Sequence, residues 1–145
     1  MIRELRQTDI DAVGALWLAA NLQAHAFIAP GYWENALGTV KELLPQAEVY
    51  VDEVGGTILG FVGVNGGHIE GIFVAENARS RGIGKSLLDV LKAKKPDLCL
   101  NVYQKNERAI RFYLREGFAI HSEGLDEDTG EKDYMMVWRR SGSRR

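Results

Sequence analysis

The sequence is poor in cysteine, in proline and in long apolar runs. Its 145 residues include one cysteine, Cys99, and three prolines. A single cysteine excludes an internal disulfide framework and a zinc site built from several thiolates. Because Cys99 lies in the apolar run "LCL", we predict a buried thiol in a reducing, cytoplasmic compartment.

Membrane and nucleic-acid partners are not expected from the bulk properties. No apolar run approaches the roughly 18 residues of a membrane span, and the charged start "MIRELRQTDI" lacks the apolar core of a secretory signal. The formal net charge is only −2, whereas nucleic-acid binding relies on a basic excess. The length and the 46% hydrophobic content fit one globular unit, so we predict a single domain over residues 1–140 and a disordered basic tail at 141–145.

Hydrophobic periodicity predicts an α/β (mixed α+β) fold. Helical spacing marks 9–23, 32–44, a segment from Gly82 to Pro96, and 106–116; strand patterns mark 2–6, 48–54, 57–65, 68–74, 98–103, 118–123 and 134–139. Short glycine turns join the three central strands, which must therefore run antiparallel. The order β-α-α-β-β-β-α-β-α-β-β predicts a mixed, mostly antiparallel sheet of about seven strands with helices on both faces.

The stretch "RSRGIGKS" at residues 79–86 is the first candidate for a ligand site. It ends like a nucleotide-binding P-loop, but that motif needs a glycine where Arg79 stands. A dinucleotide fingerprint needs a glycine where Leu87 stands. The pattern that fits is R-x-x-G-x-G, with Gly82 and Gly84 at the start of a predicted helix.

The start of this helix suits a phosphate group. The N–H groups of a first helical turn have no intrahelical partner and carry partial positive charge. Glycines remove Cβ atoms and let a diphosphate approach the backbone. Arg81 and Lys85 add positive charge, and Ser86 adds a hydroxyl. The pattern alone also allows a strand-to-helix turn with solvated basic side chains.

A second motif indicates which molecule carries the phosphates. Residues 101–118, "NVYQKNERAIRFYLREGF", resemble the N-x-x-A-x-x-F-Y-x-x-x-G-F signature of the GNAT superfamily of N-acetyltransferases. The upstream "IFVAENARSRGIGKSLL" resembles the acetyl-CoA loop of that family, and the start of the chain, "GFVGV" and "YMMVW" fit as well. Within that family the chain resembles the small bacterial YiaC and YjaB type.

The resemblance implies a GNAT-type acyl-CoA N-acyltransferase fold and a direct transfer in a ternary complex. An acetyl group would move from acetyl-CoA to a primary amine, which is a protein lysine, an N-terminus or a small-molecule amine. No metal and no covalent acyl-enzyme are implied, and such proteins are often homodimers. The pantetheine arm would lie between strands 68–74 and 98–103. The coenzyme-binding residues implied are Ile72, Phe73, Val74, Arg79, Arg81, Gly82, Ile83, Gly84, Lys85, Ser86, Asn101, Asn106 and Phe112.

Tyr113 has the clearest catalytic role by this resemblance. Asn106, Ile110 and Tyr113 are spaced i, i+4, i+7 and share one helix face, which can look into the split between the two strands. An amine attacks the thioester, an oxyanion forms, and coenzyme A leaves as a thiolate. The family's tyrosine at this position protonates that thiolate as a general acid.

The general base is left open by the sequence. Some protein-acetylating relatives carry a glutamate where this chain has Asn101, which cannot accept a proton. His68 and Glu70 are the two catalytic candidates, since they stand at i and i+2 on one strand and point to the same face. Either could accept a proton directly or through water, and an amine that arrives neutral needs no base.

Two further segments bear on the acceptor and on the alternative function. The family places acceptor choice in the segment 25–33, "HAFIAPGYW", with His25 and Tyr32 as candidate contacts, and the acidic loop 126–133 could attract a cationic acceptor. The alternative is a catalytically inactive coenzyme A-binding sensor on the same fold. Asn101 supports that alternative, and Tyr113 argues against it.

Overall fold

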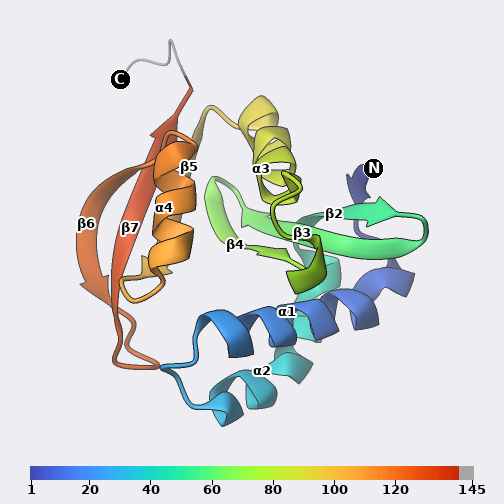
Figure 1. Cartoon of the computed structure of the whole chain (residues 1–145), viewed down its shortest axis with the longest axis horizontal. Coiled ribbons are helices and arrows are strands. Elements are labelled where there is room, and N and C mark those ends of the chain that lie inside the picture. Colours follow the sequence, from blue (N-terminus) through green and yellow to red (C-terminus); the bar gives the residue numbers. More distant parts are fainter. Residues whose placement is uncertain (141–145) are drawn as a thin grey trace.

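A mixed sheet runs through the protein, and helices cover both of its faces (Figure 1). The structure is a computed structural model that describes residues 1–140. Within these residues, seven strands lie in the order β1-β2-β3-β4-β5-β7-β6. The strands are β1 (Ile2–Glu4), β2 (Glu48–Val54), β3 (Thr57–Asn65), β4 (His68–Val74), β5 (Asp97–Tyr103), β6 (Ala119–Leu125) and β7 (Lys132–Arg139). The predicted sheet is confirmed, and the predicted tail at 141–145 lies outside the described residues.

The helices occupy opposite faces of the sheet. They are α1 (Ile10–Ala24), α2 (Pro30–Leu43), α3 (Ile83–Lys94) and α4 (Glu107–Arg115). The second helix begins two residues earlier than predicted because Pro30 occupies its first turn, where the fixed φ of proline suits a helix start. None of the helices within residues 1–140 combines the length and the apolarity needed to cross a membrane.

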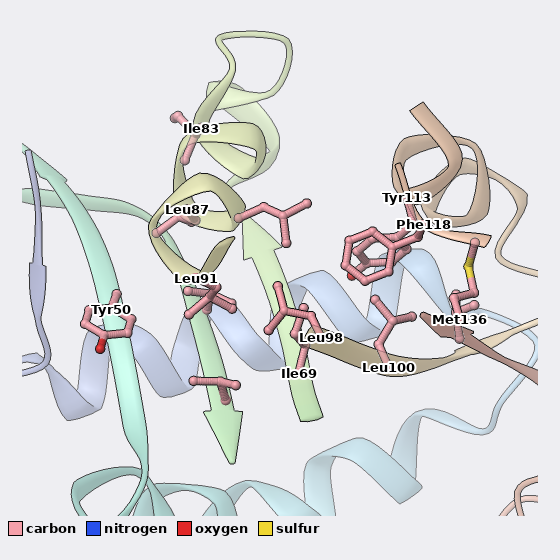
Figure 2. Close-up of a cluster of buried hydrophobic side chains, with 14 of the residues drawn as sticks. Tyr50, Ile69, Ile83, Leu87, Leu91, Leu98, Leu100, Tyr113, Phe118 and Met136 are labelled. Atoms are coloured by element: carbon pink, nitrogen blue, oxygen red, sulfur yellow. The ribbon is translucent and has the colours of Figure 1, made fainter. Parts of the chain in front are cut away.

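Apolar side chains from the sheet pack against a different pair of helices on each face. On one face, α1 supplies Ile10 and Val13 to a cluster with Val51 and Phe61. On the other face, α3 and α4 cover the larger cluster, whose side chains point toward one another in Figure 2. Its labelled members are Tyr50, Ile69, Ile83, Leu87, Leu91, Leu98, Leu100, Tyr113, Phe118 and Met136.

The prediction of a buried thiol at Cys99 is wrong, since this residue is only partly buried. Leu98 and Leu100 of β5 face α3 and α4 and are each 2% exposed. Because successive side chains of a strand alternate between faces, Cys99 points to the opposite side of the sheet.

An ion pair ties the first strand to the start of α1. Arg3 donates two hydrogen bonds to the carboxylate of Asp9, from Nη1 over 2.7 Å and from Nη2 over 3.0 Å. The backbone N–H of Arg6 donates to the same carboxylate over 2.7 Å. The hydrogen bonds from Arg3 hold the pKa of the buried Asp9 below its usual value, despite the opposing effect of burial.

Candidate active site

The sheet forks between β4 and β5. These strands are parallel, and their pairing comprises His68 with Cys99 and Ile69 with Leu100. On its other side β4 continues to pair with β3, but the register there shifts, since Gly63 pairs with Gly71 and the next residue pairs with Ile69. Glu70 is therefore the extra residue of a β-bulge, a feature that bends its strand. Beyond this bulge, β4 has no paired residue on β5 within the described chain.

A cleft of about 630 Å³ lies beside the end of β4, between α1, α4 and the start of α3. The predicted coenzyme residues that line it are Ile72, Phe73, Val74, Arg79, Gly82, Ile83, Gly84, Lys85, Asn106 and Phe112, and Tyr113 lines it too. Arg81, Ser86 and Asn101 do not line it, and the coenzyme-binding roles of the whole set stay predictions. The sequence predictions did not include the wall formed by Ala20 and Ala24 of α1 and by Arg108, Arg111 and Arg115 of α4. His25, a predicted acceptor contact that follows α1, lines the cleft as well.

The start of α3 forms one end of the cleft. Gly82 caps this helix with φ 76° and ψ 14°, a left-handed conformation that favours glycine. The first backbone bond of the helix runs from the N–H of Ser86 to the carbonyl of Gly82 over 3.0 Å. The N–H groups of Ile83, Gly84 and Lys85 therefore precede the intrahelical ladder and are available to an anion. This end of the cleft has the donors that a diphosphate needs.

Basic side chains stand around that helix start. Arg79 reaches back to α1, where its Nη2 donates to Oε1 of Gln23 over 3.0 Å. Lys85 lies 3.4 Å from a carboxylate oxygen of Asp89 and 3.4 Å from one of Glu116, and the hydrogen bond to Asp89 is the largest cause of its raised pKa. Both cations are held by partners that an incoming phosphate group can replace.

Tyr113 lies on α4 with its ring packed in the core and one side at the cleft. The ring makes edge contacts with Phe112 and Phe118, at centroid distances of 5.3 and 5.5 Å. Within residues 1–140 the phenol makes no hydrogen bond, and burial raises its pKa above the usual value. The hydroxyl is therefore protonated at neutral pH and free to donate to a bound molecule.

A hydrogen-bonded row of three side chains lies where β4 and β5 are still paired, at the root of the fork. It consists of His68, Glu70 and Asn101. Nδ1 of His68 lies 2.5 Å from Oε2 of Glu70, and Nε2 lies 3.0 Å from Oδ1 of Asn101. Burial lowers the pKa of His68, but the hydrogen bonds to Asn101 and Glu70 outweigh it, so the pKa is raised. His68 and Glu70 share a face as predicted, although neither lines the cleft.

The segment predicted to choose the acceptor forms an aromatic cluster beside the fork. His25 stacks on Trp33 at 5.3 Å and meets the edge of Tyr103 at 5.0 Å. Tyr32 meets Trp33 at 4.8 Å. The Tyr103 hydroxyl donates to Asp126 over 2.5 Å, so a hydrogen bond joins the acidic loop between β6 and β7 to this cluster.

Metal ligands are not gathered at this site. In the described part of the chain, no group of three or more His, Cys, Asp and Glu side chains is arranged to hold a metal ion.

Known proteins with similar sequences are acetyltransferases. Residues 45–120 match the family model described as an acetyltransferase (GNAT) domain. The peptidyl-lysine N-acetyltransferase YiaC of Escherichia coli (strain K12) is 37% identical over 140 residues, which cover 95% of this chain and 96% of the relative. The peptidyl-lysine N-acetyltransferase YjaB of the same organism is 27% identical over 141 residues, covering 94% and 92%.

Solved structures show the same fold. The solution structure of apo-form YjaB from Escherichia coli superposes with a TM-score of 0.85 at 24% identity, covering 95% of this chain and 96% of that one. The paiA N-acetyltransferase of Thermoplasma acidophilum, solved in complex with coenzyme A, gives 0.81 at 20% identity, covering 97% and 98%. The resemblance to the YiaC and YjaB type and the predicted GNAT fold are confirmed. The chain belongs to the GNAT family of acetyltransferases.

Proposed function

We propose that this acetyltransferase moves the acetyl group of acetyl-CoA to the ε-amine of a lysine in a protein or peptide. The observation that carries the proposal is the fork between β4 and β5, which opens from the helix-start phosphate site toward Tyr113. The relatives YiaC and YjaB are named peptidyl-lysine N-acetyltransferases, which supports lysine as the acceptor.

The cleft fits the shape and charge of the coenzyme. The diphosphate would accept hydrogen bonds from the N–H groups that begin α3, and Arg79 would turn from Gln23 to a phosphate oxygen. The pantetheine arm would follow the unpaired edge of β4 near Phe73 and Val74. Arg108 and Arg111 of α4 line the same cleft, and their guanidinium groups would attract the phosphate groups of the coenzyme.

The chemistry is aminolysis of a thioester. The neutral lysine amine attacks the carbonyl carbon, the carbonyl oxygen becomes an oxyanion, and the carbon–sulfur bond then breaks. The sulfur leaves as a thiolate, and Tyr113 donates its phenolic proton to it. The protein's contribution is to hold the thioester beside a protonated hydroxyl.

The row at the root of the fork would receive the proton that the amine loses. A raised pKa makes the His68 imidazole a stronger base than a free histidine. Nδ1–H of His68 donates to Glu70, which would stabilise the imidazolium, and Nε2 would receive the proton from the amine once it leaves Oδ1 of Asn101. We propose His68 as the base, with Glu70 as its positioning residue.

An acceptor panel tests the proposal. Coenzyme A release is followed with acetyl-CoA and three acceptors: a lysine peptide with a blocked N-terminus, a lysine-free peptide with a free N-terminus, and a polyamine. We expect release with the lysine peptide, and mass spectrometry should locate the acetyl group on the ε-nitrogen. Calorimetry with coenzyme A and with ATP completes the test. Coenzyme A binding without turnover on any acceptor would favour the sensor alternative, and ATP binding in its place would refute the proposal.

A further inference from the structure

A chain of hydrogen bonds joins α1 to the start of α4 across the cleft. Asn21 donates from Nδ2 to the carbonyl of Trp17 over 2.9 Å, and its Oδ1 lies 2.9 Å from Nδ1 of His25. Nε2 of His25 lies 3.1 Å from Nδ2 of Asn106. Oδ1 of Asn106 accepts from the backbone N–H of Ala109 over 3.3 Å and so caps α4. This series of hydrogen bonds connects His25 and Asn106, which lie 81 residues apart in the sequence.

The hydrogen bonds fix which of these side-chain atoms donates and which accepts. The amide nitrogen of Asn21 donates to the Trp17 carbonyl, so the group that faces His25 is the amide oxygen of Asn21. An amide oxygen only accepts, and Nδ1 of His25 must therefore carry the hydrogen. The side-chain oxygen of Asn106 accepts the hydrogen bond that caps α4, so the amide nitrogen of Asn106 is the group that faces His25 and must donate to Nε2. His25 is therefore a neutral imidazole with its proton on Nδ1. Asn21 is 3% exposed, so this end of the chain is shielded from water.

The imidazole is held in place by aromatic rings. Trp33 stacks on it, and the edge contacts of Phe27 and Tyr103 lie at 5.7 and 5.0 Å. A ring fixed on several sides presents Nε2 in one direction. Its partner Asn106 has two amide hydrogens, one of which is directed at Nε2, and the residue also lines the cleft.

We infer that His25 is a positioning residue that sets the amide of Asn106 to donate its second hydrogen into the coenzyme cleft. The group that receives it is an amide carbonyl oxygen of the pantetheine arm. His25 thereby links the aromatic cluster on the acceptor side to the coenzyme. The inference rests on the proposed function, because it assumes that coenzyme A occupies the cleft.

Three variants measure this role by calorimetry with coenzyme A. In His25→Phe the aromatic packing stays and the Nε2 acceptor is lost, so we expect about 5- to 10-fold weaker binding. His25→Gln places an amide oxygen near the position of Nε2 and should recover most of the affinity. In an Asn106→Ala background, His25→Phe should weaken binding no further, since the group that it positions is gone. Thermal unfolding checks that all variants are folded.

Nitrogen chemical shifts of the intact protein give a second, independent measurement. At pH 7, His25 should show the Nδ1–H tautomer, with an unprotonated Nε2. An Nε2–H tautomer would overturn the inference, and so would additive losses in the double variant or equal losses in His25→Phe and His25→Gln. If the unmodified protein bound no coenzyme A, the proposed function would fail together with the inference. If it bound coenzyme A and the losses were additive, only the inference would fail.

Discussion

Replacing Tyr113 by phenylalanine removes one oxygen atom from the wall of the cleft. The ring contacts with Phe112 and Phe118 at 5.3 and 5.5 Å remain, so the packing is conserved. The hydroxyl makes no hydrogen bond within residues 1–140, and its loss leaves no buried partner unsatisfied. We therefore expect the free energy of unfolding to change by less than about 0.5 kcal/mol.

The rate should respond differently from the stability. General acid catalysis contributes about 10²- to 10⁴-fold, which corresponds to roughly 2.7–5.4 kcal/mol in the activation free energy. Tyr113→Phe should lower kcat by that factor and leave the affinity for coenzyme A within about twofold. Thiol release with a lysine peptide measures kcat, calorimetry measures the affinity, and urea denaturation measures the stability.

Tyr50 offers a matched control. Its hydroxyl donates to a carboxylate oxygen of Glu48 over 2.6 Å, and the residue does not line the cleft. Tyr50→Phe should cost about 1 kcal/mol of stability and leave kcat unchanged. Unchanged turnover in Tyr113→Phe would refute Tyr113 as the acid. A loss of stability in Tyr113→Phe as large as that in Tyr50→Phe would show that its hydroxyl has a structural partner.

Three more changes test other parts of the structure. Gly82→Ala forces a Cβ into φ 76° and should cost about 1 kcal/mol by urea denaturation and weaken coenzyme A binding, whereas Gly31→Ala on α2, with open space around it, should be neutral or slightly stabilising. Asp9→Asn removes one of the two carboxylates that Arg3 contacts, while Glu53 remains, and should lower the free energy of unfolding by about 1–3 kcal/mol, with coenzyme A affinity unchanged. Burial lowers the pKa of His25 from 6.5 to about 4, so the unfolded chain binds the proton more readily than the folded protein. The free energy of unfolding should therefore decrease as the pH falls from 6.5 to 4. Because the ring is partly exposed we expect about 1–2 kcal/mol, and His25→Phe should remove this dependence from a melting series against pH.

The central part of the fold could be predicted because its signals are local. The strands 48–54, 57–65 and 68–74 match β2, β3 and β4, since alternating side chains and short glycine turns fix them without distant contacts. The last hairpin is longer than predicted. β7 pairs with β5 on one side and β6 on the other, and this pairing extends the strands into residues 124, 125, 132 and 133, which the sequence assigns to a loop.

The candidate site also has parts that the sequence could predict and parts that it could not. The start of α3 and the place of Tyr113 at the cleft follow from motifs confined to one loop and one helix. The bulge at Glu70 could not be predicted, because alternation along β4 gives no sign of the register shift against β3. The contacts of His68 with Asn101 and of His25 with Asn106 join residues 33 and 81 positions apart, and only the folded sheet brings them together. The arginines of α4 that line the cleft did carry a signal, since 108, 111 and 115 stand at helical spacing.

An unpaired strand edge is normally an aggregation hazard, because a strand from another chain can pair with it. The fork creates such an edge in the middle of the sheet, on β4 beyond Ile69, where the outer strands cannot protect it. The cleft beside it is walled by α1 and α4, as its lining residues show. A foreign strand with side chains on both faces would have to pass between these helices, whereas a more slender arm would fit. The same bulge that exposes the backbone therefore also restricts which molecules can use it.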